Sequence, residues 1–103
     1  MRQFEIYLNP FEQTRRFAPF VVSMQSHLLE ALPTVLVAPT YRAIERPAYS
    51  KVSVPIRFRD QDLIVSLAEL APMDARRLAR ALGDLAEYED QLRRALERVF
   101  TGF

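Results

Sequence analysis

The side chains able to do chemistry are few in this chain of 103 residues, and their spacing is poor for catalysis. His27 is the single histidine and cysteine is absent, so a metal site would need carboxylates alone. Asp60 and Asp62 stand in an Asp-Gln-Asp stretch, which is more typical of a turn than of an acid and base pair. The two glycines, Gly83 and Gly102, are too few for a P-loop or a dinucleotide fingerprint. We therefore expect a protein that is not an enzyme and that needs no metal or cofactor.

Length and composition predict one globular domain over residues 1–103. Half of the residues are apolar, which suits a single core. The formal net charge of +1 gives no field strong enough to indicate DNA or membrane binding. No apolar run approaches the roughly 20 residues of a membrane-spanning helix, and the first five residues lack the layout of a secretory signal. The absence of cysteine is compatible with a reducing cytoplasm, which is the expected location.

Alternating apolar residues predict strands through the first two thirds of the chain. The pattern is clearest over 51–59, where Val52, Val54, Ile56 and Phe58 share one face, and Pro55 indicates an edge or a bulge. Asp60 to Asp62 is predicted to turn this strand into a hairpin, and residues 10–16 are predicted as a polar loop. The other predicted strands are 3–8 with Phe4, Ile6 and Leu8 on one face, 20–25 continuing towards Leu28 and Leu29, the run 35–37 between Pro33 and Pro39, and 63–67.

The pattern changes to a helical period near the C-terminus, where acidic residues precede basic ones and suit the helix dipole. Glu89 with Arg93, and Asp90 with Arg94, are spaced to pair across one helical turn. This predicts a helix over 84–100 whose apolar stripe comprises Leu85, Leu92, Ala95, Leu96, Val99 and Phe103.

Residues 68–83 are harder to assign. Pro72 can start a helix, Asp74 can cap it, and Gly83 suits a left-handed stop, so we expect a short helix or helical turns. An antiparallel sheet followed by helix indicates an α+β or small-barrel domain. The competing interpretation takes 74–82 and 84–100 as a helix-turn-helix that binds DNA through Arg76, Arg77 and Arg80.

Three segments together resemble the CcdB toxins of bacterial toxin–antitoxin pairs. They lie at the beginning, middle and end of the chain, in order, and so span essentially its whole length. The matching residues are Phe4-x-Ile6-Tyr7-x-Asn9-Pro10, then Gln25-Ser26 with Leu28-Leu29-x-x-Leu32-Pro33-Thr34 and Val37-x-Pro39, and finally Ala95-Leu96 with Val99-Phe100-Thr101-Gly102-Phe103.

The resemblance implies a fold that is mainly β within the α+β class: an SH3-like barrel with an antiparallel sheet and a C-terminal α-helix. It also implies a homodimer that binds the A subunit of DNA gyrase and traps the cleaved-DNA complex without making or breaking a bond. An antitoxin of the CcdA type, with an acidic segment that folds on binding, would neutralise it. Neither direct sequence-specific DNA binding nor a membrane is implied. The gyrase-binding residues carried over are Thr101, Gly102 and Phe103, supported by Gln3, Phe4, Tyr7, Gln25, Ser26 and Leu28.

Thr101 departs from the family pattern, because plasmid-borne members carry Trp there, and losing that ring removes a cation–π contact. The alternative function is therefore a CcdB-fold, antitoxin-binding protein that no longer poisons gyrase. Phe103 continues the helix stripe and can equally finish the core, and Phe4 is favoured as core. Tyr7 points to the face opposite Phe4, so the two cannot share one core. The loops around Arg15 and Arg16 and over 41–50 can meet an acidic antitoxin or simply be solvated.

Overall fold

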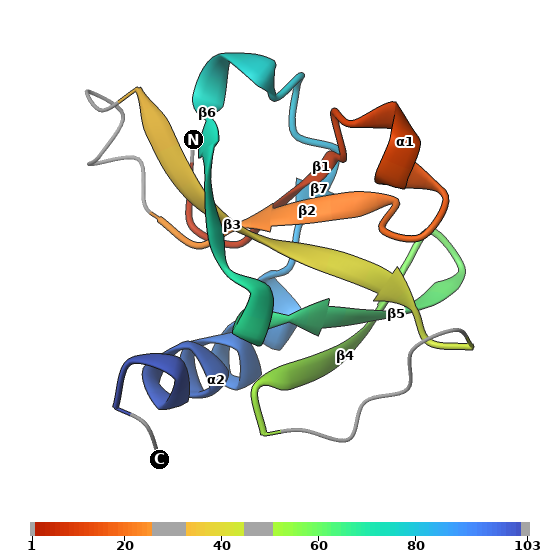
Figure 1. The fold of residues 1–103 in the computed structure, drawn as a ribbon. Helices are drawn as coiled ribbons and strands as arrows, with labels where there is room; N and C mark the ends of the chain where they lie inside the picture. The colour runs from red at the N-terminus through yellow and green to blue at the C-terminus, as the bar shows by residue number, and fades with distance from the viewer. Residues whose placement is uncertain (1, 26–32, 45–50, 102–103) are drawn as a thin grey trace.

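Antiparallel strands dominate the computed structural model, which describes residues 2–25, 33–44 and 51–101 (Figure 1). The strands curl into a half-barrel that is completed by a C-terminal α-helix, so the expected fold class is confirmed. In chain order the elements are β1 (Glu5–Leu8), α1 (Glu12–Arg15), β2 (Phe20–Ser23), β3 (Thr34–Arg42), β4 (Ser53–Phe58), β5 (Gln61–Ser66), the 3₁₀ turn η2 (Leu67–Glu69), β6 (Ala71–Asp74), η3 (Ala75–Arg77), β7 (Gly83–Asp84), η4 (Ala86–Tyr88) and α2 (Glu89–Thr101).

The sheet has the order β4-β5-β3-β2-β1-β7, and β6 joins it beside β3. β3 is longer than expected, because it continues through Pro39 to Arg42. One edge of β3 pairs with β2, while the other pairs with β6 up to Val37 and with β5 from Thr40 onward. Pro39 lies at the break between β6 and β5, where no partner needs its missing N–H. The expectation that Pro39 closes the strand was therefore wrong.

The β4–β5 hairpin confirms the clearest of the predicted strands. Val52, Val54 and Ile56 are buried, and Pro55 is exposed on β4 at the edge of the sheet. Arg59 and Asp60 form the two-residue turn with positive φ angles of 50° and 62°, and Phe58 pairs with Gln61 across it. Positive φ at both central positions is the conformation that fits the twist of a two-residue hairpin.

The region 68–83 forms two strands with a single helical turn between them. Pro72 pairs with Leu36 inside β6, and Gly83 pairs with Ile6 inside β7, so neither residue bounds a helix. Asp74 does cap a turn, η3, by accepting a hydrogen bond from the Arg76 backbone N–H at 2.9 Å. Pairing with β3 and β1 has overridden the helix propensity of this segment. The helix-turn-helix interpretation is therefore wrong.

The loop predicted over 10–16 contains a short helix, α1. The Asn9 side chain accepts a hydrogen bond from the Phe11 N–H at 3.0 Å, and the Thr14 hydroxyl donates to the Phe11 carbonyl at 3.2 Å. These bonds fold the segment locally. Leu8, expected on the buried face, is 40% exposed because β1 ends there beside an open depression.

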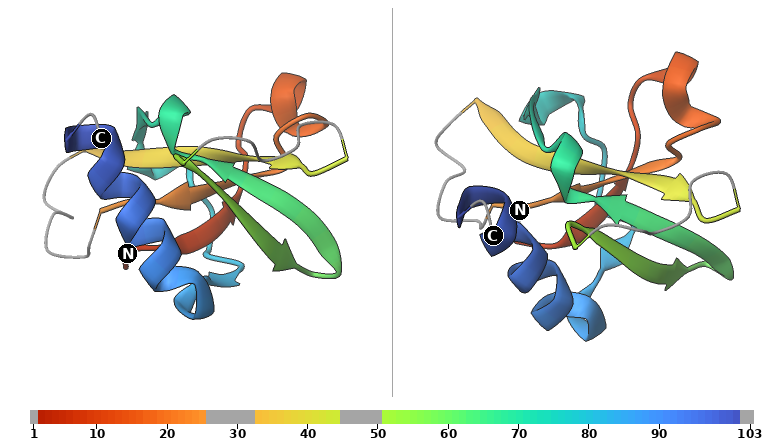
Figure 2. Two further views of the ribbon diagram at one scale, coloured as in Figure 1. Left: turned by 90° about the horizontal axis from the view of Figure 1, so that it is seen from below. Right: turned by 60° about the horizontal axis from the view of Figure 1, so that its bottom comes forward.

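One face of the sheet is covered by a helix, and the other by a short strand and an irregular segment. The main core lies under α2, which buries Leu92 and Ala95, whereas α1 lies on the opposite side of the sheet (Figure 2). On the second face Tyr7, Val21, Val35 and Val37 form a smaller cluster. That cluster is covered by residues from β6 and the irregular chain after it, namely Met73, Ala75, Leu78 and Ala81.

α2 confirms the predicted C-terminal helix, although it begins at Glu89 rather than at Asp84. Asp84 belongs to β7, and η4 fills the gap between them. The buried stripe is as expected at Leu92 and Ala95, and Leu85 is buried just before the helix. Glu89 and Arg93 form the predicted ion pair at 2.9 Å, but Asp90 and Arg94 do not form the second one.

Candidate functional site

The end of α2 is an exposed surface on an anchored helix. Leu92 and Ala95 hold the inner face of α2 in the core, while Phe100 is 68% exposed and Thr101 is exposed beside it. The Arg98 guanidinium donates to the Lys51 carbonyl at 3.2 Å, which ties the outer face to the start of the β4 region. Gly102 and Phe103, the other two expected gyrase-binding residues of this tail, lie outside the described residues.

Phe100 is an addition to the expected site. It lies next to Thr101 but off the helical stripe, since the apolar positions Leu96 and Val99 pack against the core. An aromatic side chain that a helix turns outward is more informative than an exposed aliphatic one, because aromatic residues are enriched at protein interfaces. The break in the stripe was the signal in the sequence that pointed to it.

Gln3, Phe4 and Gln25 are brought together where β1 and β2 meet. The Gln3 side-chain amide donates to the Met24 carbonyl at 3.2 Å, and the Gln25 side-chain oxygen accepts from the Leu36 N–H at 2.7 Å. Phe4 is only 2% exposed and belongs to the main core, as expected, but it stands in a turn with a φ of 65° just before β1 and so outside the strand predicted over 3–8. Its role is therefore packing, and only Gln3 and Gln25 of this group offer partly exposed polar side chains. Ser26 and Leu28 lie outside the described residues.

Tyr7 lies on the second face of the sheet, apart from Phe4, as strand alternation predicts. It is 4% exposed, and its hydroxyl donates to the Glu5 carboxylate at 3.1 Å. Burial, and then the nearby negative charge of Glu5, raise the pKa of Tyr7 to about 12. Tyr7 is thus a buried, neutral phenol rather than a surface contact.

The expected site residues fall into separate groups along α2. The Arg93 guanidinium lies 5.7 Å from the centre of the Phe4 ring, so the first turns of α2 sit beside Phe4. Thr101 is eight residues further along, which corresponds to roughly 12 Å of helix. Phe4 and Thr101 therefore belong to different ends of this helix.

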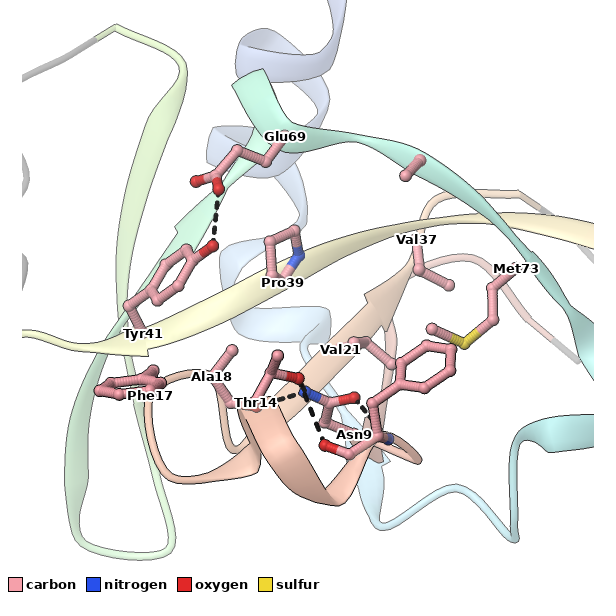
Figure 3. A pocket seen from close by; sticks show the side chains of 12 residues that line it. Asn9, Thr14, Phe17, Ala18, Val21, Val37, Pro39, Tyr41, Glu69 and Met73 are labelled. Carbon is pink, nitrogen blue, oxygen red and sulfur yellow. Dashed lines mark hydrogen bonds between the residues drawn. The ribbon is translucent and has the colours of Figure 1, made fainter.

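A pocket that the sequence did not indicate lies on the second face of the sheet (Figure 3). Its volume is about 390 Å³. Val21, Val37 and Pro39 from β2 and β3 form its floor, and Tyr41 donates a hydrogen bond to Glu69 at 2.6 Å on one rim. The remaining lining residues come from the α1 region and from β6, and are Asn9, Phe11, Thr14, Phe17, Ala18, Ala71 and Met73.

Asn9 holds the α1 side of this pocket in shape. Its side-chain amide is 4% exposed and donates to the Ala18 carbonyl at 2.8 Å and to the Thr14 hydroxyl at 3.0 Å. Its backbone carbonyl accepts from the Arg15 guanidinium at 2.8 Å. Phe11 and Phe17, in the segment organised in this way, remain 41% and 49% exposed. Phe11 within the predicted polar loop, and Phe17 directly after it, were the available signal in the sequence.

The two carboxylates singled out for chemistry, Asp60 and Asp62, lie on the β4–β5 hairpin. Asp60 occupies the hairpin turn as predicted, but Asp62, expected in the same turn, belongs to β5 and pairs with the Arg57 guanidinium at 2.8 Å. His27 lies outside the described residues. Across 2–25, 33–44 and 51–101 there is no cluster of three metal-binding side chains. In the same ranges no helix reaches the length and hydropathy needed to span a bilayer.

Comparison with known proteins places this fold among toxins. The family model "CcdB protein" matches residues 3–102. The solved structure of the Mycobacterium tuberculosis toxin MazF-mt6 is similar with a TM-score of 0.72 and 22% identity, over 97% of this chain and 97% of that one. A second structure, described as an Mtb toxin, has a TM-score of 0.68 and 24% identity, over 81% of this chain and 92% of that one. A search of curated proteins gives no match.

The family match covers nearly the whole chain, including the segments that carry the sequence resemblance except their last residue, Phe103. The half-barrel with its C-terminal helix agrees with the toxin structures in fold. The chain therefore belongs to the CcdB family and is a toxin of a toxin–antitoxin system.

Proposed function

We propose that this toxin acts in the cytoplasm as a homodimer that binds the A subunit of DNA gyrase and traps the cleaved-DNA complex. The end of α2 makes the contact, and the toxin itself makes and breaks no bond. An antitoxin of the CcdA type neutralises it. Broken DNA that gyrase does not reseal then accumulates and arrests the growth of the cell.

The observation that carries this proposal is the end of α2. Leu92 and Ala95 are fully buried, so the helix is held rigidly, while Phe100 and Thr101 are presented to solvent at its end. A rigid element that presents an exposed aromatic loses little conformational entropy when a partner covers it. Aromatic anchors of this kind often supply much of an interface's binding energy.

Inducible expression tests the proposal. The wild-type protein should arrest growth, and the purified protein should increase the cleaved DNA that host gyrase accumulates. Phe100→Ala should lower the affinity for the gyrase A subunit by tenfold or more, because a buried aromatic anchor is worth at least about 1.4 kcal/mol. Gln91→Ala, at an exposed position of the same helix that faces away from Phe100, is the matched control and should keep the affinity. A folded wild-type dimer with no affinity for the A subunit would overturn the proposal.

One residue favours the second candidate function, an antitoxin-binding protein that no longer poisons gyrase. Thr101 is exposed at the proposed contact and offers a small hydroxyl instead of the ring found in plasmid-borne members. Thr101→Trp discriminates the two. If the second function holds, the wild type does not arrest growth and Thr101→Trp restores gyrase binding. If the first holds, the wild type already binds gyrase, and the added ring increases the affinity through a cation–π contact worth about 0.5–2 kcal/mol.

A further inference from the structure

We infer that the pocket on the second face is a docking site for an acidic peptide segment that inserts one large apolar side chain. The inference deepens the proposed function, because it assigns a place on the toxin to the segment of the antitoxin that neutralises it. The site lies on the side of the sheet opposite α2, and so apart from the proposed gyrase contact (Figures 2 and 3).

The pocket's chemistry favours an apolar anchor. Val21, Val37 and Met73 line it, and its volume of about 390 Å³ is at the small end of the range for ligand sites. Its polar side chains are already engaged within the chain: the Tyr41 hydroxyl binds Glu69, and the Asn9 amide binds the α1 segment. A small polar ligand would find few groups to orient it, whereas a leucine or an aromatic side chain needs only the apolar lining.

The charges beside the pocket favour an acidic partner. The Arg16 guanidinium lies 4.6 Å from the Phe17 ring centre, and the Arg77 guanidinium lies 5.4 Å from the Phe11 ring centre. Both arginines are exposed, and neither forms an ion pair with another described residue. Each exposed phenylalanine of the rim therefore has an arginine beside it that can pair with a carboxylate of a bound partner. Because one arginine lies beside Phe17 and the other beside Phe11, a segment seated in the pocket can pair an acidic residue with each.

Ala71 provides a way to fill the pocket without disturbing the core. It is an exposed residue of β6 that lines the pocket. Ala71→Trp should occupy the space meant for the anchor, and Ala79→Trp adds the same ring at an exposed position that does not line the pocket. Arg16→Glu and Arg77→Glu reverse the rim charges, and Arg94→Glu makes the same change on α2.

The direct test uses a fluorescein-labelled 14-residue peptide of Glu and Asp with a central Leu-x-x-Phe, and the same peptide with Lys at every acidic position. Anisotropy should show that the acidic peptide binds wild type and that the affinity falls as salt rises. The affinity for the acidic peptide should fall tenfold or more in each of Ala71→Trp, Arg16→Glu and Arg77→Glu. It should be unchanged in the controls Ala79→Trp and Arg94→Glu. Equal binding of the Lys peptide, or undiminished binding to Ala71→Trp, would overturn the inference. So would a change of oligomeric state in Ala71→Trp on light scattering, because the pocket would then belong to a contact between two copies.

A cellular test separates this inference from the proposed function. Ala71→Trp should still arrest growth and still increase gyrase-cleaved DNA, but co-expressed antitoxin should no longer rescue the cells. Rescue equal to wild type contradicts the docking site. A wild type that fails to poison gyrase contradicts the proposed function instead, and the peptide measurements retain their meaning in that case.

Discussion

The two faces of the central sheet bury their apolar side chains by different means. On the α2 face a regular helix closes the core, and Ile6, Leu63 and Leu92 are completely buried. On the other face the irregular chain after β6 covers a smaller cluster, and a pocket stays open beside Val21 and Val37. A helix covers a twisted sheet with one continuous stripe, whereas a short strand and 3₁₀ turns cover only part of it. The first face therefore holds the main core, whereas the second leaves a pocket open to solvent.

Leu92→Ala should produce the largest loss of stability, since it removes a fully buried side chain between α2 and the sheet. We expect the free energy of unfolding to fall by about 3 kcal/mol, measured by urea denaturation. Phe100→Ala is the control on the same helix and should stay within about 0.5 kcal/mol of wild type, because Phe100 is exposed. Similar losses from both substitutions would mean that α2 is not anchored through its inner face.

Val37→Ala should cost less, although Val37 is nearly as well buried on the second face. We expect the free energy of unfolding to fall by about 1.6 kcal/mol, which is the transfer free energy of the two lost methyl-sized groups. The surrounding chain is less tightly closed there, and the void would join the existing pocket instead of forming a sealed cavity. The same urea experiment checks this value. A loss as large as that of Leu92→Ala would show the two faces to be equally close-packed.

Tyr7→Phe should alter how stability depends on pH in the alkaline range. The pKa of Tyr7 is raised from 10.0 to about 12, so the folded state favours the neutral phenol. The corresponding stability is fully present below pH 10 and is lost as the pH rises towards 12. The urea midpoint of the wild type should therefore fall more between pH 9.5 and pH 11.5 than that of Tyr7→Phe. Parallel curves would place Tyr7 in contact with water.

Arg76→Gln should have the smallest effect on stability, because Arg76 lies in η3, an exposed turn after β6. The side-chain hydrogen bond from Arg76, followed by that of its backbone, lowers the pKa of Asp74 from 3.8 to about 2. The contribution of ionised Asp74 is thus present above pH 4 and lost as the pH falls through about 2. Carbon-detected NMR of the Asp74 carboxylate should show its midpoint move up towards 3.8 in Arg76→Gln. An unchanged midpoint would mean that the backbone bond alone holds the carboxylate.

The same contrast explains what could be predicted from the sequence. The β4–β5 hairpin and α2 are specified by neighbouring residues, so the alternation of Val52, Val54 and Ile56 and the stripe at Leu92 and Ala95 were sufficient. β6 and β7 exist because distant strands pair with them, and local propensity around Pro72 and Gly83 predicted helix instead. Local signals therefore describe the α2 face better than the other.

The candidate site followed a similar division. The contact at the end of α2 was expected from the family resemblance, and the burial of Phe4 from its alternation with Ile6. The pocket was not, because its walls come from α1, β3 and β6, and only the folded sheet brings Phe17, Pro39 and Met73 around one space. Residues scattered over more than half of the chain carry no common spacing for a pattern to detect.

The pairing of β1 with β7 has a consequence for how the protein is made. The Leu85 N–H donates to the Phe4 carbonyl at 2.9 Å, and the Leu82 N–H donates to the Ile6 carbonyl at 2.8 Å, so the first strand is completed by residues close to α2. Contacts of such long sequence separation form late and slow the search for the native topology. On the ribosome β1 can pair with β2 early, but its other edge stays open until residues 82–85 have been synthesised. A polypeptide that stops before residue 82 therefore lacks both the strand that closes β1 and the helix that covers the core, so the fold is completed only after α2 has been translated.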